Sequence, residues 1–334
     1  MNRNVQLFID CDPGIDDLMA LVYAAAHPRV DIVGAVASGG NVSTETVARN
    51  LRGVLHLAGV PEVPWALGAK DPLGQRLTTT EETHGLFGTG YAQLPLQAEP
   101  TNRGMGEGAQ LWVDMANTYP GELDAVVLGP CTNLALALDL DPELPSKLRS
   151  LYIMGGALNH TGNTMPTTEW NIHTDPEAAY KVFETFSQPG LKCYPVLCPL
   201  DQTEKNEMTP ELRARLCAGE APVLKALDNA LQFYMEFHES DGLGFIAHVH
   251  DPFVTALAVN DSLRTKGESE VLMLGESTAT TIDVELDGRL TRGQTVADWR
   301  RRWNREHNAR VLTSADTEEF FQHYIDTVRK AFAL

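Results

Sequence analysis

Basic residues are scarce in this chain. Lys and Arg number 26 against 45 Asp and Glu, which leaves a formal net charge of −19 at pH 7. A surface of this sign repels phosphate backbones, so the composition predicts that nucleic acid is not a partner. An acidic surface tolerates a bound cation and neutral substrates, although it can equally serve solubility alone.

Cysteine is scarce as well, and its few positions form no pattern. The five residues are Cys11, Cys131, Cys193, Cys198 and Cys217. An odd set without CxxC spacing argues against a disulfide framework and against a zinc ribbon. A reducing compartment is then the default expectation.

Long apolar runs are missing too. No uninterrupted apolar stretch approaches the roughly 20 residues that a membrane helix needs. Residues 1–6 lack the charged-then-apolar build of a signal peptide. We therefore expect a cytoplasmic protein with no membrane partner.

The chain does contain regularly alternating strand and helix patterns. Apolar runs of strand length cover residues 5–9, 31–37, 124–128, 151–154 and 194–197. Helical patterns cover residues 17–26, 44–58 and 316–333, and two more helices begin at the cap-plus-proline pairs 175–176 and 251–252. This alternation predicts an α/β fold, a mostly parallel open sheet of Rossmann-like type with helices on both faces.

The segments between these patterns are interpreted as insertions. Residues 66–101 are irregular and rich in Gly, Thr and Pro, whereas residues 261–301 alternate apolar and polar side chains and predict a small added hairpin. A length of 334 residues with 43% hydrophobic content is ample for a sizeable core. Because no linker or repeat is visible, we expect one domain over residues 1–334.

Four carboxylates crowd the segment FIDCDPGIDD at residues 8–17. They are Asp10, Asp12, Asp16 and Asp17. Charges this close repel one another by several kcal/mol unless a cation or hydrogen-bond donors neutralise them. A solvated acidic turn is the alternative, but it fits poorly beside so apolar a strand. Ligands of open α/β sheets bind outside the carboxyl ends of the strands, so the segment predicts a functional site.

Two known patterns resemble this segment only partly. An EF-hand is excluded because no glycine follows a third acidic position and no glutamate closes the loop. A strand followed by Asp-x-Asp also resembles the haloacid-dehalogenase-type phosphatases, in which the first Asp, here Asp10, is a nucleophile used with magnesium. Their pattern continues with Gly-Thr, whereas Pro13 and Gly14 follow here. A magnesium phosphatase remains the alternative enzyme.

Further motifs accompany DCDPGIDD in a fixed order. They are SGGN at 38–41, HGLFGTG at 84–90, GPCTNL at 129–134, NTMPTTEWN at 163–171, HDP at 250–252 and VELDGRLTRGQTVAD at 284–298. In order and spacing this set resembles the motifs of the inosine-uridine nucleoside hydrolase family over most of the chain. The resemblance implies hydrolysis of the N-glycosidic bond of ribonucleosides to ribose and free base, in nucleoside salvage.

The resemblance also implies a calcium site. Asp12, Asp17 and Asp251 would bind Ca²⁺ through their carboxylates and Thr132 through its backbone carbonyl. An oxygen-only set suits Ca²⁺ or Mg²⁺ and argues against zinc. Many carboxylates, with room for a water and two sugar hydroxyls, favour the larger and more flexible Ca²⁺. Asp10 would support the loop.

The same resemblance assigns a ribose site. The implied residues are Asp16, Asn41, Asn163, Glu169 and Asn171. Carboxylates and amides pair with sugar hydroxyls, which both donate and accept hydrogen bonds. Taken singly, each of these residues could be an ordinary turn or loop polar residue.

For catalysis, the resemblance implies that Asp12 is the general base towards a calcium-bound water. The ribosyl group would pass through an oxocarbenium-like transition state. His250 would protonate the leaving base, which the loop around His84 would also contact. The alternative donors are His84, His238 and His248, and the roles of Tyr234 and His238 stay open, as does the choice between purine and pyrimidine bases.

A non-enzymatic alternative is a nucleoside-binding protein that has lost turnover. The intact set of Asp12, Asp17, Glu169 and Asp251 argues against such a loss. The resemblance further suggests a homodimer or homotetramer whose small-molecule partner is a ribonucleoside.

Overall fold

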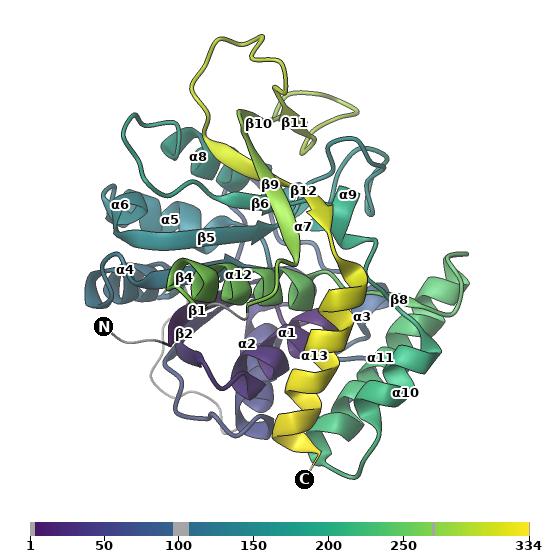
Figure 1. The fold of residues 1–334 in the computed structure, drawn as a ribbon. Coiled ribbons are helices and arrows are strands. Elements are labelled where there is room, and N and C mark those ends of the chain that lie inside the picture. Colours follow the sequence, from purple (N-terminus) through teal and green to yellow (C-terminus); the bar gives the residue numbers. More distant parts are fainter. Residues whose placement is uncertain (1–3, 96–106, 269–270, 334) are drawn as a thin grey trace.

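The computed structural model describes residues 4–95, 107–268 and 271–333. Its centre is an eight-stranded sheet in the order β3-β2-β1-β4-β5-β6-β12-β9, in which every neighbouring pair is parallel except β12 with β9 (Figure 1). The strands are β1 (Val5–Cys11), β2 (Val30–Ala37), β3 (Trp65–Leu67), β4 (Leu123–Val127), β5 (Leu148–Met154), β6 (Val196–Cys198), β12 (Ala309–Ala315) and β9 (Gly275–Thr280). The predicted mostly parallel α/β sheet is confirmed.

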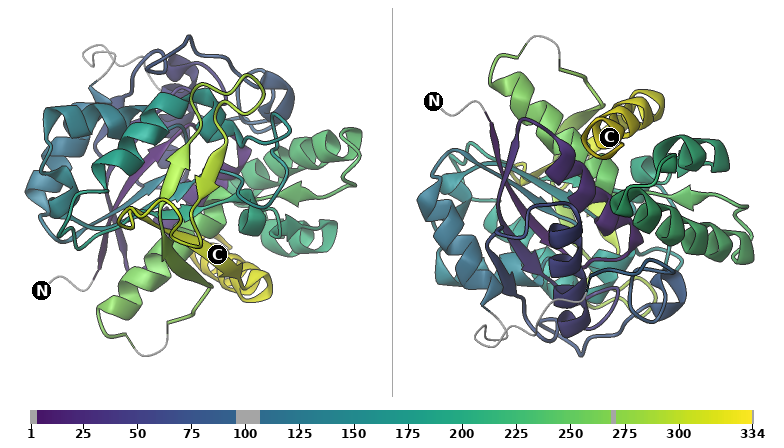
Figure 2. Two further views of the ribbon diagram at one scale, coloured as in Figure 1. Left: turned by 90° about the horizontal axis from the view of Figure 1, so that it is seen from above. Right: turned by 90° about the horizontal axis from the view of Figure 1, so that it is seen from below.

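Helices cover both faces of this sheet, as predicted (Figures 1 and 2). Successive β1 residues point to opposite faces: Leu7 and Ile9 join one apolar cluster, and Phe8 joins the other. The first cluster takes in α1 (Ile15–Ala26), α2 (Thr44–Leu57), α11 (Pro222–Ser240), α12 (Asp251–Thr265) and α13 (Thr317–Phe332). The second takes in α4 (Gly108–Thr118), α5 (Thr132–Leu140) and α8 (Pro176–Thr185). Since both faces are covered, every residue of β1 is buried, which explains why most of them are apolar.

The remaining elements are short or lie outside the sheet. The predicted hairpin is confirmed as β10 (Ile282–Val284) paired antiparallel with β11 (Thr295–Ala297). A second antiparallel pair joins β7 (Glu207–Met208) to β8 (Ala247–His248), and between them α10 (Pro210–Cys217) and α11 project to one side of the molecule (Figure 2). The short helices are α3 (Glu81–His84), α6 (Leu144–Lys147), α7 (Trp170–Thr174) and α9 (Leu200–Thr203).

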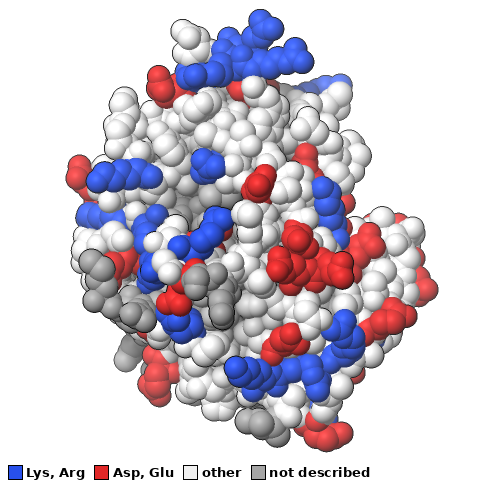
Figure 3. Space-filling model, viewed as in Figure 1, with Lys and Arg blue, Asp and Glu red and all other residues white. Residues whose placement is uncertain are grey.

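On the face shown in Figure 3, charged side chains of one sign gather in two places. Figure 3 shows arginines gathered where the chain passes from β11 to β12, a loop that contains Arg300, Arg301 and Arg302. Carboxylates gather beside the start of α13, where Asp316 caps the helix and Glu318 follows it. No helix in the described ranges is long and apolar enough to cross a membrane.

Strand order places the acidic segment at a special position. From β1 the chain passes to β2 and β3 on one side of the sheet, and it reaches β4, β5 and β6 on the other. The connections after β1 and β4 therefore leave the carboxyl edge in opposite directions and open a crevice between them. The turn after β1, residues 12–14, lies at the mouth of this crevice.

Candidate active site

A pocket of about 570 Å³ lies at the carboxyl edge of the sheet. Its wall contains residues that follow β1, β2 and β4, together with the start of α12 and one side of α11. Ten of the predicted site residues contribute to this pocket or to the cluster beside it, and they are Asp12, Asp16, Asp17, Asn41, His84, Asn163, Glu169, Asn171, His250 and Asp251. Segments up to about 240 positions apart thus meet at one site, because parallel strands all end at the same edge.

The turn after β1 is held by its own last acidic residue. The Asp17 carboxylate accepts hydrogen bonds from the backbone N–H groups of Asp12 at 3.1 Å and Gly14 at 3.0 Å. These bonds satisfy donors at the start of α1 that have no partner inside the helix. The helix consequently begins at Ile15, two residues earlier than the sequence predicts, and Asp16 lies in its first turn.

The position of Asp12 is fixed by residues that lie outside the turn after β1. Its Oδ2 accepts the backbone N–H of Asn41 at 2.8 Å, and the Asn41 side chain donates to the Asp12 carbonyl at 3.1 Å. Two glycines leave room for the carboxylate: a Cβ on Gly40 would lie 2.0 Å from Asp12 Oδ2, and one on Gly129 would lie 2.8 Å from Oδ1. The glycines of the SGGN and GPC motifs therefore shape the space around one side chain.

This close approach makes Gly40 a sharp test of how Asp12 is placed. We expect Gly40→Ala to lower kcat/KM by about 10²-fold, because displacing a reacting group by about 1 Å costs that much. Gly59→Ala is the matched control, since Gly59 has a positive φ of 80° and a methyl group added there would have nothing within 4 Å. It should lower the melting temperature through backbone strain and leave kcat/KM unchanged. A Gly40→Ala enzyme with wild-type kcat/KM would contradict this account.

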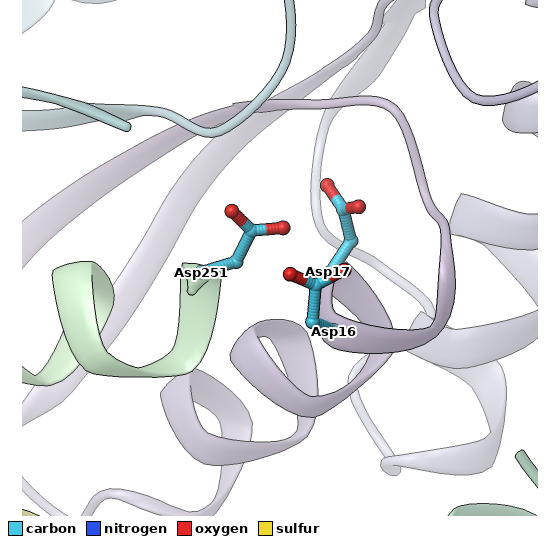
Figure 4. A group of neighbouring side chains, drawn as sticks. All are labelled: Asp16, Asp17 and Asp251. Carbon is cyan, nitrogen blue, oxygen red and sulfur yellow. The ribbon is translucent and has the colours of Figure 1, made fainter. Parts of the chain in front are cut away.

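Three further carboxylates converge next to the turn. Oxygens of Asp16, Asp17 and Asp251 lie within 4.8 Å of one another, and all three side chains are buried (Figure 4). Asp16 and Asp17 come from the start of α1, and Asp251 is the first residue of α12. Two helix N-termini thus face this group, which favours negative charge there but only modestly.

The carboxylates of this group strongly oppose one another's ionisation. Burial raises the pKa of Asp16 to about 7, helped by the charge of Asp17. Burial followed by repulsion from neighbouring carboxylates raises the pKa of Asp12 and of Asp251 well above the ordinary range. The Asp12 charge is among those acting on Asp251, so Asp12 borders the same group. Such a group needs protons or a cation to be stable.

Asp10 lies behind the pocket and does not line it. Its carboxylate accepts hydrogen bonds from Ser38 Oγ, from Trp112 Nε1 at 2.7 Å and from Asn133 Nδ2 at 3.3 Å. It is fully buried, and burial raises its pKa to about 6. These bonds connect the ends of β1 and β2 to α4 and α5, as expected of a residue that supports the loop.

Thr132 also has a partner that the sequence does not reveal. Its Oγ1 donates to Asp175 Oδ2 at 2.6 Å, and Asp175 in turn caps α8 by accepting the Ala178 N–H. Thr132 is the first residue of α5 and its side chain does not line the pocket. The use of its backbone carbonyl as a metal ligand stays a prediction.

The loop between β5 and α8 supplies a rigid polar wall. The Glu169 carboxylate caps α7, accepting the N–H groups of Asn171 at 2.7 Å and Ile172 at 3.0 Å, and it also accepts that of Gly156. Both donors of the Asn171 amide are used, on the carbonyls of Leu128 and Met154. What Asn171 can still offer a ligand is therefore its oxygen, an acceptor for a hydroxyl proton.

Histidines and one tyrosine line the opposite wall. The rings form a chain in which each lies close to the next. The centroids of His84 and Tyr234 are 5.3 Å apart, and those of Tyr234 and His238 are 4.5 Å apart. The chain continues from His238 to His248 at 5.1 Å and from His248 to His250 at 6.4 Å. Burial lowers the pKa of His84 to about 3 and that of His250 well below its ordinary value. These rings are therefore neutral near pH 7 and can present N–H donors without a permanent charge.

Hydrogen bonds orient two of these rings. His84 Nδ1 accepts the Ile15 N–H at 3.2 Å, which leaves its proton on Nε2. His250 Nδ1 pairs with Thr203 Oγ1 at 2.9 Å, and the His250 backbone N–H points to Asp16 Oδ2 at 3.4 Å. The sequence leaves Tyr234 and His238 open, and the structure places both on this wall. Other wall residues were missed altogether, namely Glu82, Glu204, Phe237, Asp241 and the threonines at 78–80.

Comparison with known proteins identifies close relatives of the whole chain. The family described as inosine-uridine preferring nucleoside hydrolase matches residues 7–322. The pyrimidine-specific ribonucleoside hydrolase RihA of Escherichia coli K12 is 34% identical over 325 residues, which cover 97% of this chain and 98% of RihA. Among solved structures, the plant nucleoside hydrolase PpNRh1 superposes with a TM-score of 0.84 at 27% identity, covering 97% of this chain and 98% of its own. The purine-preferring ribonucleoside hydrolase from Gardnerella vaginalis gives 0.85 at 26% identity, covering 98% of each chain.

Proposed function

Because the chain belongs to the inosine-uridine preferring nucleoside hydrolase family and is an N-glycosyl hydrolase of ribonucleosides, we propose that it works with calcium and with Asp12 as the general base. The observation that carries this proposal is a single pocket with two unlike walls. One wall holds buried carboxylates, and the other holds neutral histidines. The first suits a cation and a sugar, and the second suits a departing base.

The donor set fits calcium. Oxygens bound to one Ca²⁺ at 2.3–2.6 Å can lie up to about 5 Å apart, so the closely grouped oxygens of Asp16, Asp17 and Asp251 can border one cation. No cysteine or histidine belongs to this group, so zinc is disfavoured. We propose Asp12, Asp17 and Asp251 with the Thr132 carbonyl as the ligands. A bound Ca²⁺ supplies a positive charge that neutralises the carboxylates, binds hydroxyls and lowers the pKa of a water.

Each group of the protein would then have a role that depends on its place in the pocket. Asp12, held by the Asn41 N–H, accepts the proton of the attacking water. Asn163, Asn171 and Glu169 orient the sugar hydroxyls. As the bond to the base breaks, positive charge develops on the ribosyl ring, and the carboxylates around it stabilise that charge. Because Glu169 is fixed by three backbone donors, its contribution requires little rearrangement.

The leaving base needs a proton, and we propose that His250 takes up a proton from solvent in the substrate complex and passes it to the base. His250→Ala should slow natural nucleosides about 10²–10⁴-fold more than a riboside with an activated phenolate leaving group, because only the former needs the proton. Steady-state kinetics on both substrates measure this gap. His84→Ala and His238→Ala are the comparison variants and should show smaller gaps. Equal losses on both substrates for His250→Ala would assign it a structural or sugar-binding role.

One assay tests the proposed function against its alternatives. Ribose release is measured with inosine, adenosine, guanosine, uridine and cytidine. Tight nucleoside binding without any ribose release would identify a silent binding protein. A phosphatase would form a phosphoenzyme at Asp10, but Asp10 is buried behind the pocket and engaged by three donors, which argues against that alternative. A cytoplasmic location and a homodimeric or homotetrameric state remain predictions.

A further inference from the structure

The pocket contains carboxylates that the mechanism does not use, namely Glu82, Glu204 and Asp241. Glu204 follows α9 and lines the pocket on the side of Tyr234, His248 and His250. Its neighbour in sequence, Thr203, is the hydrogen-bond partner of His250 Nδ1. Glu204 therefore follows directly on the residue that contacts the proposed proton donor. A role for it in base recognition rests on the proposed function.

The position of Glu204 is held by its surroundings. Its backbone N–H donates to the Leu200 carbonyl at the end of α9. Its side chain is 23% exposed, and Oε2 lies 3.6 Å from Nε2 of His160, whose loop also reaches the pocket at residues 161–164. Since His160 is the one ion-pair partner given for Glu204 among the described residues, this partly buried carboxylate still has free acceptor capacity at the pocket.

In the part of the chain that the structure describes, the pocket is lined by acidic side chains without basic ones. Among the described residues that line it, none is Lys or Arg, and the nearby rings are histidines, Tyr234 and Phe237. Burial raises the pKa of Glu204, and the adjacent His160 opposes that rise. Burial raises the pKa of Tyr234, as do the charges of Asp16, Asp251 and Asp17 and, to a smaller extent, that of Glu204. A keto oxygen placed against Glu204 would meet an acceptor, and no described Lys or Arg of the pocket lining offsets its charge.

We propose that Glu204 selects nucleobases that present an exocyclic amine, cytosine and adenine, over their keto counterparts uracil and hypoxanthine. A carboxylate only accepts hydrogen bonds, and an amine donates them. A keto oxygen at the same place would face the carboxylate, and both groups would lose hydrogen-bond partners on binding.

The test compares matched substrate pairs. Cytidine and uridine differ in the exocyclic group at C4 and in the hydrogen on N3, and adenosine and inosine differ in the same way at C6 and N1. We expect the wild-type protein to favour the amine member of each pair by about 10-fold to 100-fold in kcat/KM, the range for a hydrogen bond to a charged group. Glu204→Gln should bring each ratio within about threefold of unity, because an amide both donates and accepts. The amine-to-keto ratio of kcat/KM in the wild type is divided by the same ratio in Glu204→Gln. This quotient cancels the difference in intrinsic reactivity between the two bases.

Controls separate this inference from the proposed function. Asp241→Asn changes another carboxylate of the pocket and should leave both ratios unchanged. Uridine turnover within a fewfold of wild type would show that Glu204→Gln is folded; if the variant is unfolded, Glu204→Asp should reduce the ratios partially. Ratios that Glu204→Gln leaves unchanged, or a wild-type preference for the keto bases, would overturn the inference. No ribose release from any nucleoside would instead overturn the proposed function.

Discussion

Replacing Asp12 by Asn is expected to remove tightly held calcium and to lower kcat/KM for every nucleoside by at least about 10⁴-fold, since a general base alone supplies about 10²–10⁴ and a metal ion adds several kcal/mol. The amide keeps the size of the carboxylate and an oxygen that can accept the Asn41 N–H. It cannot take a proton from water, and it removes one negative charge from the cation site. Steady-state kinetics and metal analysis by mass spectrometry on the same samples measure the two losses together.

A matched control and a metal exchange complete this experiment. Asp114→Asn changes a carboxylate of α4 that pairs only with Gln110 on the surface, and it should alter neither metal content nor kcat/KM. Chelation of the wild-type protein should abolish activity, and added Ca²⁺ should restore it. Full activity in protein that is free of calcium and loaded with zinc would refute the assignment of calcium.

Much of this site follows from the sequence pattern alone. The alternation of strand and helix patterns indicates a parallel sheet, and parallel strands end at one edge. Polar residues that follow different strands, such as Asp12 after β1 and Asn41 after β2, must then meet. His250 and Asp251 lie at the start of α12 and do not follow a strand of the central sheet. Their place in the site can be predicted only once α12 is known to pack on α1.

The pairing of the supporting residues could not be predicted. Trp112 reaches Asp10 from α4, and Asp175 reaches Thr132 from the cap of α8. Each is an ordinary residue in its own segment, and only tertiary packing brings the partners together. The space that Gly40 leaves for Asp12 depends likewise on an approach between two chain segments.

Some elements of the fold were missed for local reasons. Residues 132–140 form α5, but Leu and Ala alternate in them as side chains do in a strand. The spacing of the apolar residues therefore does not distinguish a helix from a strand. β12 is half exposed and follows the hairpin, so nothing local indicates that it inserts between β6 and β9. The long helix α11 did carry a signal, because Leu224, Leu227 and Leu231 recur at helical spacing and are buried. It positions Tyr234 and His238, which explains why the base side of the pocket was the least predictable part.

The sequence motifs and the geometry differ on which carboxylates bind the metal and which bind the sugar. The motifs assign Asp12 to the metal and Asp16 to ribose, whereas the three oxygens within 4.8 Å belong to Asp16, Asp17 and Asp251. Both arrangements are compatible with one cation bordered by four carboxylates. A substrate that lacks one hydroxyl separates them, because it removes the proposed partner of Asp16 and leaves the protein unchanged.

We therefore expect 2′-deoxynucleosides to be very poor substrates. In the proposed pose the 2′-hydroxyl is shared between Asp16 and the cation, so the deoxy analogue leaves a carboxylate that is only 5% exposed without its partner. Backbone N–H groups at the start of α12 also contact this carboxylate, that of His250 at a long 3.4 Å, but they are present with either substrate and do not replace the hydroxyl. Sites built around a substrate hydroxyl reject the analogue lacking it by about 10⁴–10⁵-fold. Water that refills the gap would recover part of this loss, which sets a floor of about 10²-fold.

Asp16→Ala provides the internal control for this placement of ribose. It should slow ribonucleosides sharply and narrow their advantage over deoxynucleosides, because the carboxylate that lacks a partner in the deoxy complex is gone. Kinetics on uridine with deoxyuridine and on inosine with deoxyinosine measure the advantage in both proteins. If wild-type kcat/KM is comparable within each pair, ribose does not bind Asp16 through its 2′-hydroxyl. If the advantage is large but survives in Asp16→Ala, the hydroxyl is recognised by the cation and the other carboxylates, and Asp16 belongs with Asp17 and Asp251 as a ligand of the metal.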